Sequence, residues 1–232
     1  MGFTPENAEG HFDLGVIYYE LGEHEAAIEQ FQAALRLDET HAQAYNNLGL
    51  VYIDLGLMSP AIEAFQKAID IEPDNPTFYN NLGYLYYRED EFEPAINAYR
   101  EAIEHDPEFQ DAYYNLAAAY HAEDHFEDAA IYYQKAIELD PSDPDPYYNL
   151  GQLYQETEQF DLAIETYEAA LFLDDSDPEA YYRLGQMYQK QGNHLTMQRY
   201  LDLFIEKAAN LPQFQDEIEN AKRMKRGITS DN

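Results

Sequence analysis

A leucine followed by a small residue recurs in this chain every 34 residues without drift. The six copies are Leu14-Gly15, Leu48-Gly49, Leu82-Gly83, Leu116-Ala117, Leu150-Gly151 and Leu184-Gly185. Self-similarity at a fixed period of this length is the signature of a stacked repeat array. Such arrays generally act by presenting a long surface, so the period favours a binding function over a catalytic one.

Aromatic and alanine positions keep the same register. In the second copy, Tyr45, Leu48 and Tyr52 are spaced three and four residues apart, which places them on one face of a helix. Ala61 and Phe65 repeat that spacing and indicate a second helix. Small residues at fixed places let the two helices approach closely while aromatic rings fill the gaps between them. No stretch has the alternation expected of a strand.

With these columns the chain resembles the tetratricopeptide repeat family, whose units are 34-residue helix-turn-helix hairpins. The resemblance implies an all-α fold, a right-handed α-solenoid of six hairpins. The expected copies are residues 8–41, 42–75, 76–109, 110–143, 144–177 and 178–211. The end copies depart from the pattern, with His11 at an aromatic position of the first and Met197 at an alanine position of the last. Divergent end copies are expected of caps, which lack one neighbour.

The segments outside the six copies are short. Leu211, Phe214, Ile218 and Ala221 keep a helical spacing, which predicts a helix over residues 212–226. The family resemblance implies that this helix caps the last hairpin. Residues 1–7 are expected to be a lead and residues 227–232 a flexible tail. We expect one elongated domain with no internal linker.

Composition indicates a soluble, cytoplasmic protein. No apolar run approaches the roughly 20 residues that cross a bilayer, and no charged-then-apolar leader opens the sequence. There are no cysteines, so no disulfide framework is expected.

The charge is strongly acidic and unevenly placed. The chain has 46 acidic and 13 basic residues, a net charge of −33 at pH 7. Residues 1–182 hold 40 acidic and 5 basic residues, whereas residues 183–232 hold 6 acidic and 8 basic ones. Such a field disfavours nucleic acid, whose phosphates bind lysine and arginine. It favours a basic partner, and the alternative is that the acidity serves solubility or adaptation to high salt.

The candidate binding residues lie on the first helix of each hairpin, which lines the concave side in this family. Just before the leucine stand Asp13, four asparagines and Arg183; the asparagines are Asn47, Asn81, Asn115 and Asn149. They resemble the asparagine ladder of superhelical peptide binders, and a carboxamide can both donate to and accept from a peptide backbone. Three intervals of about 8 to 10 Å would hold roughly nine extended residues. Alternatively, each asparagine bonds only to the next hairpin.

Further groove candidates share that helical face, either as partner anchors or as packing between repeats. They are Tyr84, Tyr87, Arg88, Tyr114, Tyr148, Gln152, Tyr182, Arg183 and Lys190. The basic clamp by which one branch of the family binds C-terminal carboxylates is not expected, because no cluster of cations precedes Arg183.

We expect no catalytic, metal or cofactor site. His121 and His125 are four residues apart, but they straddle a predicted turn and lack the glutamate that follows the first histidine in metalloproteases. The aspartate-rich segments 140–145 and 174–177 lack the glycine and closing glutamate of calcium loops. The basic residues of segment 222–226 are interpreted as complementing a helix C-terminus.

The sequence therefore predicts a non-enzymatic adaptor or assembly scaffold that binds a protein or peptide segment in its groove, a basic one if the acidity serves binding. The alternative is a structural subunit that assembles as a homo-oligomer or in a larger complex through its terminal hairpins.

Overall fold

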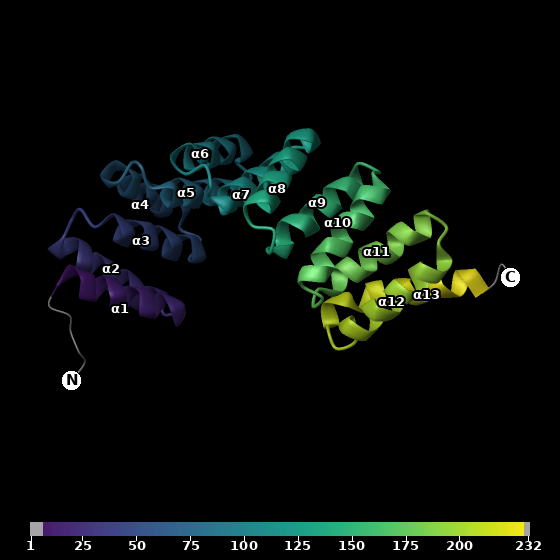
Figure 1. The fold of residues 1–232 in the computed structure, drawn as a ribbon. Coiled ribbons are helices and arrows are strands. Elements are labelled where there is room, and N and C mark those ends of the chain that lie inside the picture. The colour runs from purple at the N-terminus through teal and green to yellow at the C-terminus, as the bar shows by residue number, and fades with distance from the viewer. Residues whose placement is uncertain (1–6, 230–232) are drawn as a thin grey trace. The chain divides into compact units, whose positions relative to one another are not determined.

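The computed structural model describes residues 7–229, which fold into helices joined by short turns. In chain order these are α1 (Ala8–Glu20), α2 (His24–Leu37), α3 (Ala42–Asp54), α4 (Met58–Ile71), α5 (Pro76–Arg88), α6 (Phe92–His105), α7 (Gln110–Ala122), α8 (Phe126–Leu139), α9 (Pro144–Glu156), α10 (Phe160–Leu173), α11 (Pro178–Lys190), α12 (His194–Ala208), the 3₁₀ helix η1 (Pro212–Phe214) and α13 (Gln215–Thr229). Each 34-residue copy holds one helix pair (Figure 1). An all-α repeat solenoid is thus confirmed over the described residues.

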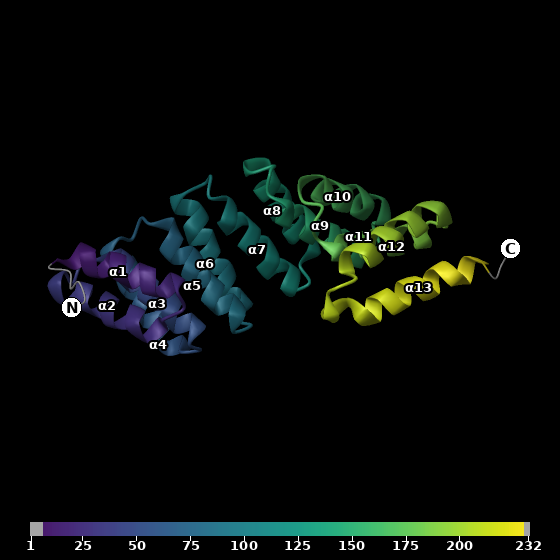
Figure 2. The same cartoon turned by 90° about the horizontal axis from the view of Figure 1, so that it is seen from below.

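The helices form two compact units, which we describe separately. One holds α1 to α7 and ends at Glu123, and the other begins at Asp124 and holds α8 to α13. The expectation of one undivided domain is corrected here, since the division falls inside the fourth copy. In a repeat array each helix packs on its immediate neighbours, so no common core joins distant copies. Within each unit, successive helices lie side by side (Figure 2).

In the first, second, third and fifth hairpins, a glycine of the first helix makes room for a ring of the second, and in the sixth hairpin Gly185 does so for Leu201. A Cβ atom built on Gly49 would lie 2.7 Å from Phe65 Cε1, and one built on Gly83 would lie 2.7 Å from Tyr99 Cδ1. Both rings are buried, with at most 1% of their surface exposed. The rings therefore pack directly on the backbone of the first helix, which explains the Leu-Gly period.

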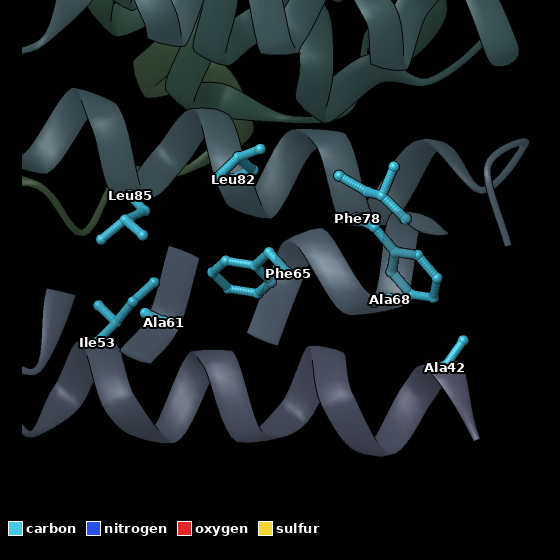
Figure 3. Close-up of a cluster of buried hydrophobic side chains, with 9 residues drawn as sticks. Ala42, Ile53, Ala61, Phe65, Ala68, Phe78, Leu82 and Leu85 are labelled. Carbon is cyan, nitrogen blue, oxygen red and sulfur yellow. The ribbon is translucent and has the colours of Figure 1, made fainter. Parts of the chain in front are cut away.

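Successive hairpins join through the second helix of one and the first helix of the next. Buried side chains of α4 and α5 meet in this way, as Figure 3 shows: Ala61, Phe65 and Ala68 lie beside Phe78, Leu82 and Leu85. None of these six is more than 8% exposed. The joint excludes water, and it buries the apolar stripe of every first helix that has a preceding hairpin.

The turn inside the hairpins places a residue in the left-handed backbone region. Glycine fills this position in three copies and an acidic residue in the other three: Gly22, Gly56, Gly192, Asp90, Asp124 and Glu158. The φ angles run from 58° to 73°. A side chain in this region costs about 1–2 kcal/mol, so the three acidic turns carry local strain.

The C-terminal helix covers the last hairpin. Ile218 and Ala221 of α13 are buried in one cluster with Leu201 and Phe204 of α12. The helix begins at Gln215 and continues to Thr229, so the expected tail is wrong for residues 227–229. Residues 230–232 of that tail and residues 1–6 of the expected lead lie outside the described residues. No helix in the described part of the chain is long and apolar enough to cross a membrane.

Candidate functional site

Asparagines of successive first helices are joined by side-chain hydrogen bonds in the first unit. Asn81 Nδ2 donates to Asn46 Oδ1 over 2.8 Å, and Asn115 Nδ2 donates to Asn80 Oδ1 over 3.0 Å. Asn46 and Asn80 are buried, at 6% and 9% exposure, whereas Asn81 and Asn115 are half-buried. The acceptors are thus held in the interior and the donors stand nearer the surface.

Each of these bonds spans 35 residues, one period plus one position. The asparagine just before the leucine of one copy therefore donates to the asparagine two positions before the leucine of the preceding copy. Asn81 and Asn115 therefore bond to the preceding hairpin, whereas the alternative expectation named the next one. Asn47 accepts from Asn46 Nδ2 over 3.2 Å. A carboxamide has two N–H donors and two acceptor lone pairs, so one bond leaves most of its capacity unused.

Tyr84 and Arg88 are the exposed members of the further groove candidates in the first unit. Tyr84 is 42% exposed, and Arg88 Cζ lies 6.0 Å from its ring centroid. Tyr87 turns inward, with its ring centroid 5.6 Å from that of Phe92, and burial raises its pKa. Tyr114 is half-buried on α7. Only part of this set is therefore exposed.

Tyr19 and Asp54 form a hydrogen-bonded pair on the same face that the sequence analysis missed. Burial, followed by the hydrogen bond to Asp54 and repulsion from its carboxylate, raises the pKa of Tyr19 to about 12, with a smaller contribution from Tyr84. Tyr19 occupies the position of Tyr87 in its copy, and Asp54 occupies that of Arg88. Comparing these two columns could have found the pair.

In the second unit, Arg183 is an ion-pair partner rather than a free cation. Its Nη2 and Nε lie 2.6 Å and 3.2 Å from Glu179 Oε1, and it is hydrogen bonded to Tyr148. Burial raises the pKa of Tyr148, although Arg183 opposes this shift. The ring of Tyr148 lies 5.6 Å from that of Tyr167. Asn149 is half-buried on α9 in this unit.

Tyr182 belongs to the packing between α11, α12 and α13. It is 8% exposed, its ring centroid lies 4.9 Å from that of Phe204, and its hydroxyl accepts from Asn220 Nδ2 over 2.6 Å. Asn220 thus bonds to the preceding first helix as Asn81 bonds to Asn46. The capping helix supplies the link that a further hairpin would otherwise provide.

The remaining predicted residues of this unit contact their own surroundings at the surface. Gln152 Nε2 donates to Glu156 Oε1 over 3.0 Å. Lys190 Nζ lies 4.4 Å from the ring centroid of Phe160.

A small cavity of about 100 Å³ beside Tyr148 is lined by carboxylates. Asp145, Asp174 and Asp177 line it together with apolar side chains of α9, α10 and α11. Loss of hydration raises the pKa of Asp145 and of Asp177, and repulsion from neighbouring carboxylates adds to both shifts. Negative charge is therefore crowded on this part of the second unit.

In segment 222–226, Arg226 lies in the last turn of α13 and donates from Nε to the carbonyl oxygen of Lys222, whereas Lys222 and Lys225 pair with acids. Lys222 Nζ lies 2.7 Å from Glu219 Oε1, and Lys225 pairs with Asp202. The interpretation as a helix-end charge is corrected for these two lysines. Among residues 7–229, no group of three or more His, Cys, Asp or Glu side chains is placed to hold a metal ion.

The repeated hairpins and their polar first-helix faces define a helical-repeat solenoid. Models described as TPR repeat match residues 17–56, 59–90 and 156–192. Models described as tetratricopeptide repeat match residues 80–144, 132–165 and 179–210. The chain belongs to the tetratricopeptide repeat family, whose members are generally non-enzymatic protein-interaction modules. No curated protein matches it.

Solved structures share the fold. The crystal structure of MamA is 27% identical, with a TM-score of 0.63 over 70% of this chain and 95% of that one. PilF of Pseudomonas aeruginosa is 19% identical, with a TM-score of 0.80 over 93% and 96%. YrrB, described as a TPR protein with an unusual peptide-binding site, is 21% identical, with a TM-score of 0.66 over 83% and 97%.

Proposed function

We propose that this protein is an adaptor that binds an extended peptide segment across the first-helix face of its first unit. The observation that carries the proposal is the state of Asn81 and Asn115. Each is anchored by one donor bond to the preceding repeat, is half-buried, and keeps a carboxamide oxygen and a second N–H. An anchored side chain loses less rotamer entropy on binding than a mobile one.

The spacing suits an extended backbone. Packed helices lie about 8 to 10 Å apart, so the two intervals from Asn47 through Asn81 to Asn115 cover about 20 Å. An extended peptide advances about 3.3 Å per residue, which corresponds to about six residues. A carboxamide that contacts both N–H and C=O groups holds the peptide backbone without selecting its side chains.

Side-chain preference would come from the residues around these asparagines. Tyr84, at 42% exposure, offers an apolar ring with a polar end, the kind of side chain that is enriched at interface hot spots. The chain up to Glu123 has 24 acidic and 4 basic residues, so a basic peptide is favoured. YrrB, which has the same fold, is described as having a peptide-binding site, and this is a precedent for peptide binding by such a fold.

Two matched pairs of variants test the proposal. Asn81→Ala with Asn115→Ala removes both the inter-repeat bonds and the ladder carboxamides, whereas Asn46→Ala with Asn80→Ala removes the same bonds and leaves those carboxamides in place. Peptides are selected from a random display library on the purified protein. Their affinity for the protein and for each pair of variants is then measured by fluorescence anisotropy.

The first pair is expected to weaken binding at least tenfold, about 1.4 kcal/mol, and the second pair by less than threefold. Equal losses in both pairs would show that the asparagines act through packing alone. Affinity that the first pair leaves unchanged would also refute the proposed site.

A further inference from the structure

The outward face of α1 leaves Ile17 exposed at a position that every later first helix buries. Leu21, just after the helix, is exposed too, at a position that is also exposed in the second copy, where Leu55 is 37% exposed. Ile17 is 51% exposed, and Leu21, four residues on, is 67% exposed. The five residues at the position of Ile17 in the later copies are at most 1% exposed: Val51, Leu85, Ala119, Leu153 and Met187. Leu14 is half-buried, whereas its five counterparts are at most 8% exposed. We call this surface the α1 face. It consists of Gly10, Leu14 and Ile17 together with Leu21 just after the helix.

The repeat itself indicates what shape covers such a face. In α5 the corresponding residues Phe78, Leu82 and Leu85 are covered by the second helix of the preceding hairpin (Figure 3). Among residues 7–229, α1 is not preceded by such a helix. The geometry that recurs along the array therefore fits an α-helix with an apolar stripe, lying against the α1 face.

The charge around the α1 face defines the chemistry of that helix. Asp13 and Glu20 stand one residue before Leu14 and Leu21, so both lie on the same side of the stripe. Residues 7–40 hold eight acidic residues, and Arg36 is their one basic residue. A helix with lysine or arginine beside its stripe is attracted to this surface, and an acidic one is repelled.

We propose that the α1 face is a docking site for an amphipathic, basic α-helix of a partner protein. The apolar residues of this site lie on the outward side of the first hairpin and not among the ladder asparagines, although Asp13 stands at the ladder position of the first copy. A second copy of this chain presenting the same face would place Asp13 and Glu20 against their own equivalents, and like charges across an interface oppose association. The charge therefore favours a basic partner helix over self-association through this surface.

Three synthetic 16-residue helical peptides serve as probes. One carries a leucine and phenylalanine stripe flanked by lysines, the second carries the same stripe flanked by glutamates, and the third keeps the lysines but has serine in place of the stripe. Binding to the full chain is measured by fluorescence anisotropy at low and at high salt. The lysine-flanked apolar peptide is expected to bind at least tenfold more tightly than either of the others, and more weakly as salt rises.

Ile17→Ser with Leu21→Ser tests the place of binding. Both side chains are more than half exposed, so the substitutions are compatible with folding. These substitutions should weaken the binding of the lysine-flanked peptide at least tenfold. The matched control Leu195→Ser changes a leucine on α12 that is 81% exposed, and it should leave the affinity of that peptide unchanged. Asp13→Lys with Glu20→Lys should reverse the preference toward the glutamate-flanked peptide.

Three outcomes would overturn the proposal. One is an affinity that Ile17→Ser with Leu21→Ser leaves unaltered while circular dichroism reports an intact fold. Another is equal binding of the serine-stripe peptide, which would indicate unspecific attraction to an acidic protein. The third is a dimer in light scattering that Ile17→Ser with Leu21→Ser converts to a monomer, since the α1 face would then bind a second copy of this chain.

Discussion

Removing the side-chain amide of Asn46 is expected to destabilise the first unit by about 1–2 kcal/mol. Asn46 is 6% exposed, and its Oδ1 accepts from Asn81 Nδ2 over 2.8 Å. A hydrogen bond of this kind contributes about 0.5–1.5 kcal/mol, and a donor left partly buried without a partner adds to the loss. In a protein of this length such a loss lowers Tm by about 2–8 °C.

A double-mutant cycle isolates the bond from the cavity that the substitution leaves. Asn46→Ala and Asn81→Ala, alone and together, are compared by urea unfolding at 25 °C, followed by circular dichroism. We expect a coupling free energy of about 1 kcal/mol, because the two side chains are in direct contact. Asn97→Ala, at an exposed position of α6, is the control and should be additive with Asn46→Ala. Coupling within about 0.3 kcal/mol of zero for the contacting pair would refute the inter-repeat bond.

Three further predictions concern packing, turn strain and charge. Gly83→Ala should lower the free energy of unfolding by about 1 kcal/mol, since a clash 2.7 Å from Tyr99 outweighs the gain in helix propensity. Gly227→Ala, which meets nothing within 4 Å, should show no such loss in the same urea melts. Glu158→Gly should raise stability by about 0.5–1 kcal/mol, because φ is 59° there, and an unchanged midpoint would argue against strain. The raised pKa of Asp177 means that its ionisation costs stability above its ordinary pKa of 3.8. Asp177→Asn should therefore stabilise the protein at pH 7 and progressively less as the pH falls toward 3.8, whereas a gain that does not depend on pH would contradict the charge argument.

The fold follows from the sequence because one column of the repeat corresponds to one environment. Gly49 and Phe65 recur as Gly83 with Tyr99 and as Gly151 with Tyr167, and the structure packs each glycine against its ring. The same comparison would have found the strained turns, since Glu158 and Asp90 align with Gly56. The repeat columns therefore predict both the packing inside the hairpins and the geometry of their turns.

The polar contacts were harder to predict. Four asparagines stand before the leucine, but which neighbour each one contacts depends on the lateral offset of adjacent first helices, and that offset is a property of the packed array. Tyr182 stands on the predicted face and is nevertheless covered, because α13 packs over the last hairpin. Arg183 is likewise neutralised by Glu179, four residues earlier on the same helix. A residue's place on a helical face therefore does not establish that it is accessible.

Nuclear magnetic resonance of the side-chain amides tests the central claim most directly. The Nδ2 signals of Asn81 and Asn115 are assigned, and a library-selected peptide is titrated into the labelled protein. We predict that both signals shift in proportion to the bound fraction, while that of Asn220 on α13 stays in place. Saturating peptide that leaves the signals of Asn81 and Asn115 unmoved would contradict peptide binding on the first-helix face.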